Sequence, residues 1–282
     1  MQKGDGIDTM NGTAIQHPDI SPEFQEFLRS VTRTIINDHI EKAALSIAGT
    51  VAERWPFISA SAGKNTGNDF ADSASLSLAC GISSASIFIG IRDKSLSAFF
   101  ETFRDSLEKQ LSLACSIKSM LIKDPLSGLF NSAYFDECSA SLFRDKKLSS
   151  LAFIDIDKFK TVNENYGHKL GNSLINSFAS FLKQQLSENM AAFRYGGDEF
   201  AIIFSGSEKD DVIRFLSELV RVTSLTEFPC GEFPGKINIS ISAGAAFADN
   251  AFRNETAMLS AAEKAMFSAK KSGGGKLFAE QN

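Results

Sequence analysis

The sequence predicts an α+β protein in two parts, an all-helical module over residues 21–122 and a mixed domain over residues 123–282. Three observations support this prediction. The first part carries apolar residues at helical spacing, and the second alternates strand patterns with helix patterns. Within the second part, the motif Gly-Gly-Asp-Glu at residues 196–199 joins two apolar segments, as in a β-hairpin.

The N-terminal part begins with a polar, glycine-rich stretch, residues 1–20, which we expect to be disordered. Ser-Pro-Glu at residues 21–23 then supplies an N-cap, a first-turn proline and an early acid. Apolar residues continue at helical spacing through residues 24–40. Residues 59–72 are rich in Ser, Ala, Gly and Asn and predict a loop, whereas the small and apolar stretch 73–91 predicts another helix.

The last predicted helix of this part runs from Lys94 to Leu121 and carries a continuous apolar seam. Its members lie three or four residues apart: Leu96, Phe100, Phe103, Leu107, Leu111, Ala114, Ile117 and Leu121. Such a seam suits pairing with another helix. The partner is either a helix of a second copy, which would make a dimer, or a helix of the same bundle, and the sequence leaves both open.

The C-terminal part alternates predicted helices and strands. The helices are expected near 131–145, 170–186, 209–224 and 255–271, and the strands near 149–156, 190–204 (a hairpin), 237–243 and 276–279.

The hairpin would hold two carboxylates at its turn. Gly196 and Gly197 are predicted to supply the positive φ of a two-residue turn, which leaves Asp198 and Glu199 at the sheet edge beside open backbone. Acidic side chains next to bare backbone suit a divalent metal that carries a nucleotide phosphate. An ordinary acidic hairpin is the alternative for this motif taken alone.

A second acidic strand resolves that alternative. The apolar run from Leu151 ends in Asp155-Ile156-Asp157. A carboxylate at the end of a buried strand, beside a hairpin with two more, is how a palm-type polymerase site collects its metal ligands. An unpaired carboxylate at such a position is costly, which argues against surface charges without a role.

Four motifs in this order resemble the GGDEF-domain family, the diguanylate cyclases. They are Asp-Pro-Leu-Ser-Gly-Leu-Phe-Asn at 124–131, the strand ending in Asp-Ile-Asp, the hairpin, and Ala-Ala-Glu-Lys-Ala-Met-Phe-Ser-Ala-Lys at 261–270. They cover the chain from about residue 120 onward, and the N-terminal module resembles no family that we recognise. The resemblance implies a palm-like, ferredoxin-related domain with a mostly antiparallel sheet.

The resemblance also implies an activity. Such a bacterial signalling transferase condenses two GTP molecules into cyclic di-GMP and pyrophosphate, as a homodimer that requires Mg²⁺ (or Mn²⁺). The N-terminal module would regulate the cyclase in response to an unknown signal.

The same resemblance assigns roles to individual residues. Asp155, the carbonyl of Ile156 and Asp198 would bind metal, Asp198 would also take the hydroxyl proton, and Glu199 would support this cluster. Lys160 would be a catalytic lysine that holds the phosphates. The substrate would be bound by Lys158, Phe159, Asn163, Asn172 and Lys270.

Three positions depart from the family pattern. Asn172 stands where an aspartate reads guanine, Gly274 stands where a phosphate-binding arginine is expected, and residues 187–190 lack the Arg-x-x-Asp of the inhibitory product site. Asn172 favours a cyclase of relaxed specificity that also uses ATP. Asn172 and Gly274 together favour a catalytically weak GTP-binding receptor or interaction module.

Composition argues against other classes of protein. A net charge of −5 argues against a nucleic-acid binder. No signal peptide and no apolar run of membrane-spanning length is found, which predicts a cytoplasmic protein without a membrane span. The 4 cysteines form no CxxC pair, and we expect them to be reduced.

Overall fold

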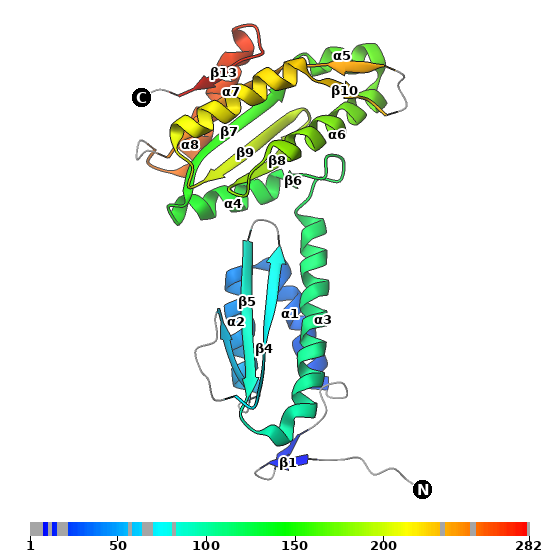
Figure 1. The fold of residues 1–282 in the computed structure, drawn as a ribbon, viewed down its shortest axis with the longest axis vertical. Coiled ribbons are helices and arrows are strands. Elements are labelled where there is room, and N and C mark those ends of the chain that lie inside the picture. The colour runs from blue at the N-terminus through cyan, green and yellow to red at the C-terminus, as the bar shows by residue number, and fades with distance from the viewer. Residues whose placement is uncertain are drawn as a thin grey trace. The chain divides into compact units, whose positions relative to one another are not determined.

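The computed structural model describes residues 8–10, 13–15, 22–55, 58–63, 70–80, 83–231, 235–248 and 252–280. The chain divides into two compact units, Met1–Leu121 and Ile122–Asn282, which are described separately (Figure 1).

The N-terminal unit mixes helices and strands. In chain order its elements are β1 (Asp8–Met10), β2 (Thr13–Ile15), α1 (Pro22–Asn37), α2 (Ile40–Arg54), β3 (Ile58–Ala62), β4 (Asp72–Cys80), β5 (Ser83–Ile91), the 3₁₀ helix η1 (Lys94–Leu96) and α3 (Ser97–Leu121). β1 and β2 pair antiparallel, and the rest of the segment 1–20, for which we predicted disorder, lies outside the described residues.

The prediction of an all-helical module is wrong, because β3, β4 and β5 form an antiparallel sheet in the order β3-β5-β4. The stretch predicted as a helix, 73–91, is the β4–β5 hairpin. Its pattern has period two, since Leu76 and Leu78 are buried while Ser75 and Ser77 are exposed. The small residues of this stretch obscured the alternation, because a pattern rich in serine and alanine does not distinguish a helix from a strand.

The seam of α3 packs inside this unit. Phe103, Leu107 and Leu111 are at most 2% exposed. The ring centroid of Phe103 lies 5.3 Å from that of Phe24 on α1 and 5.1 Å from that of Trp55. The sequence left open whether the seam pairs with a second copy or with a helix of the same unit. This part of the seam packs within its own unit.

The C-terminal unit is built on a six-stranded sheet in the order β13-β12-β7-β9-β8-β6 (Figure 1). Its elements are β6 (Phe130–Asn131), α4 (Ser132–Arg144), β7 (Leu148–Ile156), α5 (Phe159–Tyr166), α6 (His168–Gln185), β8 (Met190–Gly196), β9 (Glu199–Ser205), α7 (Lys209–Leu225), β10 (Glu227–Pro229), β11 (Lys236–Asn238), β12 (Ile241–Phe247), α8 (Glu255–Lys271) and β13 (Leu277–Ala279). The four central strands pair antiparallel, and the two edge strands, β6 and β13, pair parallel.

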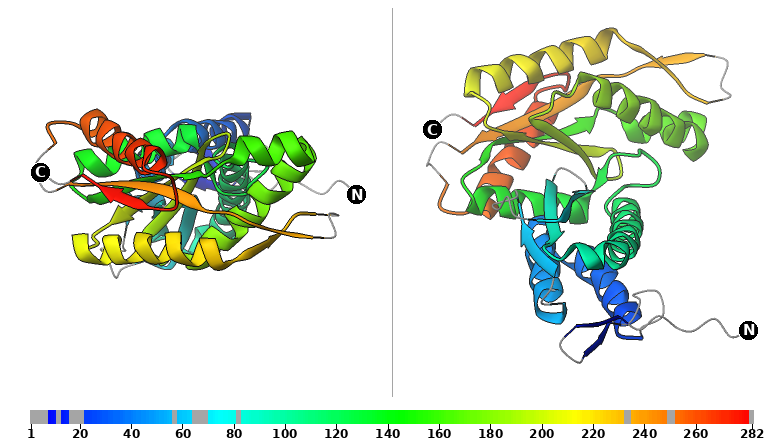
Figure 2. Two further views of the ribbon diagram at one scale, coloured as in Figure 1. Left: turned by 90° about the horizontal axis from the view of Figure 1, so that it is seen from above. Right: turned by 60° about the horizontal axis from the view of Figure 1, so that its bottom comes forward.

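Helices cover both faces of this sheet (Figure 2). Alternate residues such as Ile154 and Ile202 join one core with α6 and α7. On the opposite face Phe153 meets Phe135 of α4, with ring centroids 5.6 Å apart. The strand predicted near 237–243 proves to be two elements, β11 and β12, because its pairing moves from β10 to the main sheet.

Among the described helices none has the length and apolar character that crossing a bilayer requires. Cys115, Cys138 and Cys230 take part in no disulfide bond.

Candidate functional site

Sheet pairing brings the predicted acidic residues together at one end of β7. Asp155 lies opposite Glu199 of β9 on one side and Ser242 of β12 on the other. The backbone N–H of Ile156 donates to the carbonyl of Asp198 at 3.3 Å. Residues separated by more than forty positions in the sequence thus meet at one sheet edge.

The turn of the β8–β9 hairpin differs from the prediction. Neither Gly196 nor Gly197 has a positive φ, so that part of the prediction is wrong. The register of the two strands shifts between Arg194 and Gly196, and this irregularity lets the turn close without a left-handed residue. No atom lies within 4 Å of where a Cβ of Gly197 would be, so the backbone is open there as expected.

Arg194 holds the hairpin to the first motif of the domain. Its Nη1 lies 3.1 and 3.2 Å from the two carboxylate oxygens of Asp124, and its Nε and Nη2 donate to the carbonyl of Gly197 at 3.1 and 2.8 Å. Burial opposes the ionisation of Asp124, but hydrogen bonds from Ser127 and Arg194 outweigh it and lower the pKa of this carboxyl. Asp124 opens the motif at residues 124–131, and no sequence pattern pairs it with Arg194.

Asp155 is a buried carboxylate of the site with only one of its two oxygens hydrogen-bonded. It is 2% exposed, and its Oδ2 accepts from Lys270 Nζ at 2.6 Å while its Oδ1 has no hydrogen-bond partner. Burial raises the pKa of Asp155 to about 6. The hydrogen bond to Lys270 lowers this pKa, and the negative charges of Asp198 and Glu199 raise it further. The Asp155 side chain therefore has one acceptor oxygen without a hydrogen bond, and it lies near two further negative charges, those of Asp198 and Glu199.

This donor set fits a divalent cation. Hard cations prefer carboxylate and carbonyl oxygens, and Asp155 Oδ1 is an orphaned oxygen of that kind. Within the described part of the chain, no three His, Cys, Asp or Glu side chains are already arranged around one point. A metal would therefore need further oxygens besides those of the two predicted aspartates, Asp155 and Asp198.

The predicted phosphate-binding residues lie at the start of α5. Lys158 is exposed and left-handed with φ 58°, and Phe159 is buried at 8% exposure. Lys160 is exposed, and its Nζ lies 3.8 Å from Glu164 Oε1. The structure thus places Lys160 on the segment that follows β7 but pairs it with its own helix.

Asn163 and Asn172, the predicted base readers, lie on α5 and on the neighbouring helix α6. A Cβ on Gly171 would lie 2.0 Å from Asn163 Oδ1, so the Asn163 side chain lies directly over that glycine. Asn172 is the next residue along α6, and it is exposed.

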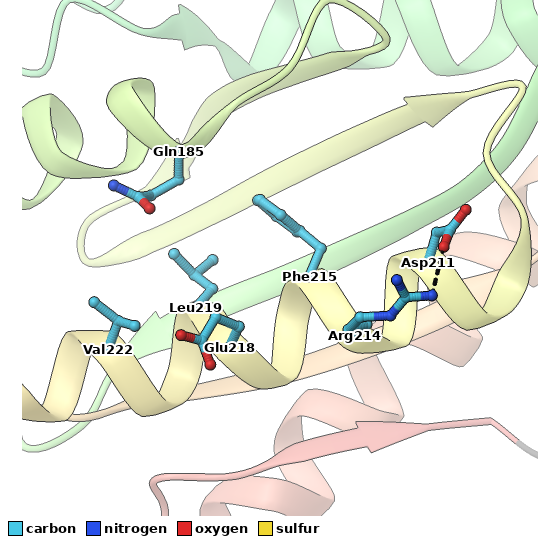
Figure 3. Close-up of a pocket in the computed structure, with 7 residues that line it drawn as sticks. All are labelled: Gln185, Asp211, Arg214, Phe215, Glu218, Leu219 and Val222. Atoms are coloured by element: carbon cyan, nitrogen blue, oxygen red, sulfur yellow. Dashed lines mark hydrogen bonds and ion pairs between the residues drawn. The ribbon is translucent and has the colours of Figure 1, made fainter.

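A pocket beside α7 lies apart from these residues. Its lining, drawn in Figure 3, contains none of the predicted site residues: Gln185, Asp211, Arg214, Phe215, Glu218, Leu219 and Val222.

Comparison with known proteins agrees with this geometry. The family model "Diguanylate cyclase, GGDEF domain" matches residues 121–276, more than half of the chain, and leaves the N-terminal unit unmatched. The chain belongs to this family.

Individual relatives are similar over the same part. The chain is 30% identical over 159 residues to the probable diguanylate cyclase DgcI of Escherichia coli K12, and the match covers 52% of the chain and 34% of that protein. It is 38% identical over 97 residues to the diguanylate cyclase VdcA of Vibrio cholerae, which covers 34% and 28%. The chain thus spans about a third of the length of these relatives.

A solved structure supports the fold. The GGDEF domain of DgcB from Caulobacter crescentus, crystallised with c-di-GMP, matches with a TM-score of 0.53 and 26% identity over 57% of this chain and 94% of that one.

Proposed function

We propose that the chain is a diguanylate cyclase, which condenses two GTP molecules into cyclic di-GMP and two pyrophosphates. The observation that carries the proposal is the buried Asp155 with its unpartnered Oδ1, set beside Asp198 and Glu199 at the end of β7. A buried carboxylate with a vacant acceptor is costly unless a ligand uses it.

In the proposed reaction, each 3′-hydroxyl loses its proton and forms a bond to the α-phosphorus of the other GTP. The bond from that phosphorus to the bridging oxygen breaks, and pyrophosphate leaves. Asp198 takes the hydroxyl proton, and Glu199 supports the metal-binding cluster. Asp155, the carbonyl of Ile156 and Asp198 would hold Mg²⁺ or Mn²⁺, which supplies charge neutralisation at the phosphates.

Cationic and backbone donors would orient the triphosphate. Lys160 and the amides at residues 158–160 hold the β- and γ-phosphates in this proposal, with Lys270 at the end of α8. Asn163 and Asn172 contact the base from α5 and α6. Because each subunit presents one GTP, a homodimer completes the reaction, and the N-terminal unit would regulate it.

Product analysis tests the proposal. The full chain is incubated with Mg²⁺ and GTP, and the products are identified by mass. We expect cyclic di-GMP from the wild type, and none from Asp198→Ala or Asp155→Asn with the fold retained. Asp210→Asn, at an exposed position on α7, is the matched control. Undiminished turnover in either site variant would remove the catalytic assignment.

Asn172 supports a second candidate, a cyclase that also uses ATP. The exposed amide can present either its oxygen or its NH₂ to a base, whereas a carboxylate can only accept. Incubation with ATP, and with both nucleotides, distinguishes this candidate. GTP binding without any product would instead favour the receptor or interaction module.

A further inference from the structure

Asp157 lies two residues beyond Asp155, but all of its carboxylate is engaged by the protein. Its Oδ1 accepts from Ser242 Oγ at 2.6 Å, and its Oδ2 accepts from Ser240 Oγ at 2.6 Å and from the N–H of Gly275 at 2.8 Å. Its own N–H donates to the carbonyl of Ser240 at 2.9 Å. Asp155, by contrast, keeps one oxygen unused.

These bonds join three elements around the candidate site: the end of β7, the start of β12 and the turn that follows α8. That turn is unusual, because Gly273, Gly274 and Gly275 all have positive φ, at 105°, 72° and 65°. A Cβ on Gly274 would lie 2.8 Å from three atoms of the Asp157 carboxyl group. The turn is therefore shaped around this carboxylate, and a side chain at residue 274 would displace it.

Backbone hydrogen bonds connect the turn at residues 273–275 to the end of α8, where Lys270 lies. The N–H of Gly273 donates to the carbonyl of Lys270 at 3.1 Å, and the N–H of Gly274 donates to the carbonyl of Ala269 at 3.2 Å. These bonds close the C-terminus of α8. Lys270 Nζ then reaches Asp155 at 2.6 Å.

We propose that Asp157 is a positioning residue, not a metal ligand, and that it fixes Lys270 for contact with the triphosphate by fastening the turn at residues 273–275. The proposal rests on the proposed function, because it takes Lys270 as a phosphate-binding residue. A flexible lysine loses less entropy on binding when the end of its helix is already fixed.

Asparagine at residue 157 separates the two roles. An amide oxygen can replace Oδ2 as acceptor for Ser240 and Gly275, and the NH₂ can donate to Ser242, whose hydroxyl also accepts. Asp157→Asn should therefore keep the turn, whereas Asp157→Ala loses every one of these side-chain bonds. A metal ligand would tolerate neither change.

The test measures binding of 3′-deoxy-GTP, which lacks the nucleophile and cannot condense, by calorimetry with Mg²⁺. We expect Asp157→Ala and Lys270→Ala each to weaken its binding about tenfold, as for loss of one charge-assisted hydrogen bond. The double variant should bind no more weakly than Lys270→Ala, GMP binding should be unchanged, and Asp157→Asn should remain within about threefold of the wild type. Asp145→Ala, on the exposed C-cap of α4, is the control.

Several outcomes would overturn the proposal. A loss in Asp157→Asn as large as in Asp157→Ala would make Asp157 a metal ligand, and equal losses for GMP, or losses that add to that of Lys270→Ala, would make it a purely structural residue. Should Asp157→Ala fail to fold, Ser242→Ala takes its place with a smaller expected loss.

A second readout does not depend on nucleotide. Amide hydrogen exchange at residues 273–275 should accelerate in Asp157→Ala and not in Asp157→Asn. Unchanged exchange in Asp157→Ala contradicts the fastening of the turn. Accelerated exchange together with a wild type that binds no 3′-deoxy-GTP would instead contradict the proposed function and the role given to Lys270.

Discussion

Asp155 and Asp157 show how one residue type takes two roles over a two-residue spacing. Both follow the same apolar strand, yet the Asp157 carboxylate accepts three hydrogen bonds from the protein, and Asp155 accepts one and leaves Oδ1 without a partner. A fully satisfied carboxylate stabilises the fold around it, whereas a partly satisfied one is costly and favours a ligand.

The burial of Asp155 predicts a pH dependence of stability. Its pKa is raised from 3.8 to about 6, so the folded protein holds this proton more tightly than the unfolded chain does. The stability from this group is therefore fully present below about pH 4 and is lost as the pH rises to about 6. A shift of about two pKa units corresponds to about 3 kcal/mol.

Asp155→Asn removes this titration. We expect the free energy of unfolding of the variant, relative to the wild type, to rise by about 3 kcal/mol between pH 4 and pH 7. Urea denaturation at each pH without divalent cations measures it, and Asp210→Asn is the exposed control. A difference that does not change with pH would show that Asp155 titrates normally.

Asn172 predicts the choice of base. A carboxylate at this position would accept from two guanine N–H donors and repel the acceptor N1 of adenine, and the amide loses that discrimination. We expect measurable use of ATP in competition with GTP, and a GTP preference roughly 10–100-fold stronger in Asn172→Asp. Asn165→Asp, at an exposed position on α5, is the matched control. Equal preferences in wild type and Asn172→Asp would exclude Asn172 from base reading.

Sequence motifs could predict single site residues but not their pairings. Asp155, Asp198 and Glu199 stand at or beside the ends of apolar segments that the sequence predicts as strands. The Arg194–Asp124 pair and the bonds of Asp157 depend on tertiary contacts between residues 70 and up to 118 positions apart. No local pattern encodes such a contact.

At the scale of elements, α8 lies unusually close to β12. A Cβ on Gly244 would lie 2.0 Å from the N of Met266 and 2.3 Å from the carbonyl oxygen of Ala262, both backbone atoms. Backbone cannot move aside as a side-chain end can. Gly244 therefore sets the depth at which α8, which carries Lys270, packs on the sheet.

Gly244→Ala should destabilise the protein by about 1–3 kcal/mol or more, because α8 must move away from the sheet. The melting temperature measures this loss. Gly49→Ala provides the contrast, since Gly49 lies within α2 with no atom within 4 Å of its Cβ position and should stabilise by about 0.5–1 kcal/mol. A neutral Gly244→Ala would mean that α8 does not depend on this close approach.

The loop before β8 predicts weak product inhibition. Ser187 Oγ donates to Asn189 Oδ1 at 2.6 Å, and Asn189 Nδ2 donates to Ser207 Oγ, beyond the end of β9, at 2.7 Å, so these polar groups of the loop are engaged by the protein. It offers no guanidinium for bidentate binding of a guanine or phosphate. We expect initial rates that added cyclic di-GMP leaves unchanged. Calorimetry that shows tight product binding together with loss of turnover would disprove this expectation.

Element prediction succeeded where the period was clear and failed where small residues obscured it. The helices α6 and α7 carry large apolar residues at helical spacing, and they lie where predicted. Among the side chains of β4 that the structure describes, Leu76 and Leu78 are buried, and the small residues Ser73, Ala74, Ser75 and Ser77 stand around them. The strand assignment there depends on pairing with β5, which the sequence does not display.

At the scale of the whole molecule, an exposed stripe on α3 replaces the buried seam as the candidate dimer surface. Leu113 and Met120 are 53% and 76% exposed, seven residues apart, and Ile117 between them is half-buried. This is heptad spacing, and it continues on the outer side of a helix whose inner side is already packed. Charges at Phe103 or Leu107 would therefore disrupt the fold of the unit, and cannot test dimerisation.

Dimerisation through this stripe predicts a rate that depends on protein concentration. Because the proposed reaction joins two GTP molecules held by different subunits, the rate per subunit should rise with concentration until dimers saturate. Leu113→Glu and Met120→Glu should shift this rise to higher concentration, since each places charges opposite one another in a dimer, while Ser112→Glu, exposed on α3, should not. Sedimentation over the same concentrations reports the assembly state. A wild type that is monomeric at full activity would contradict the homodimer, and unchanged dimers in both glutamate variants would place the contact elsewhere.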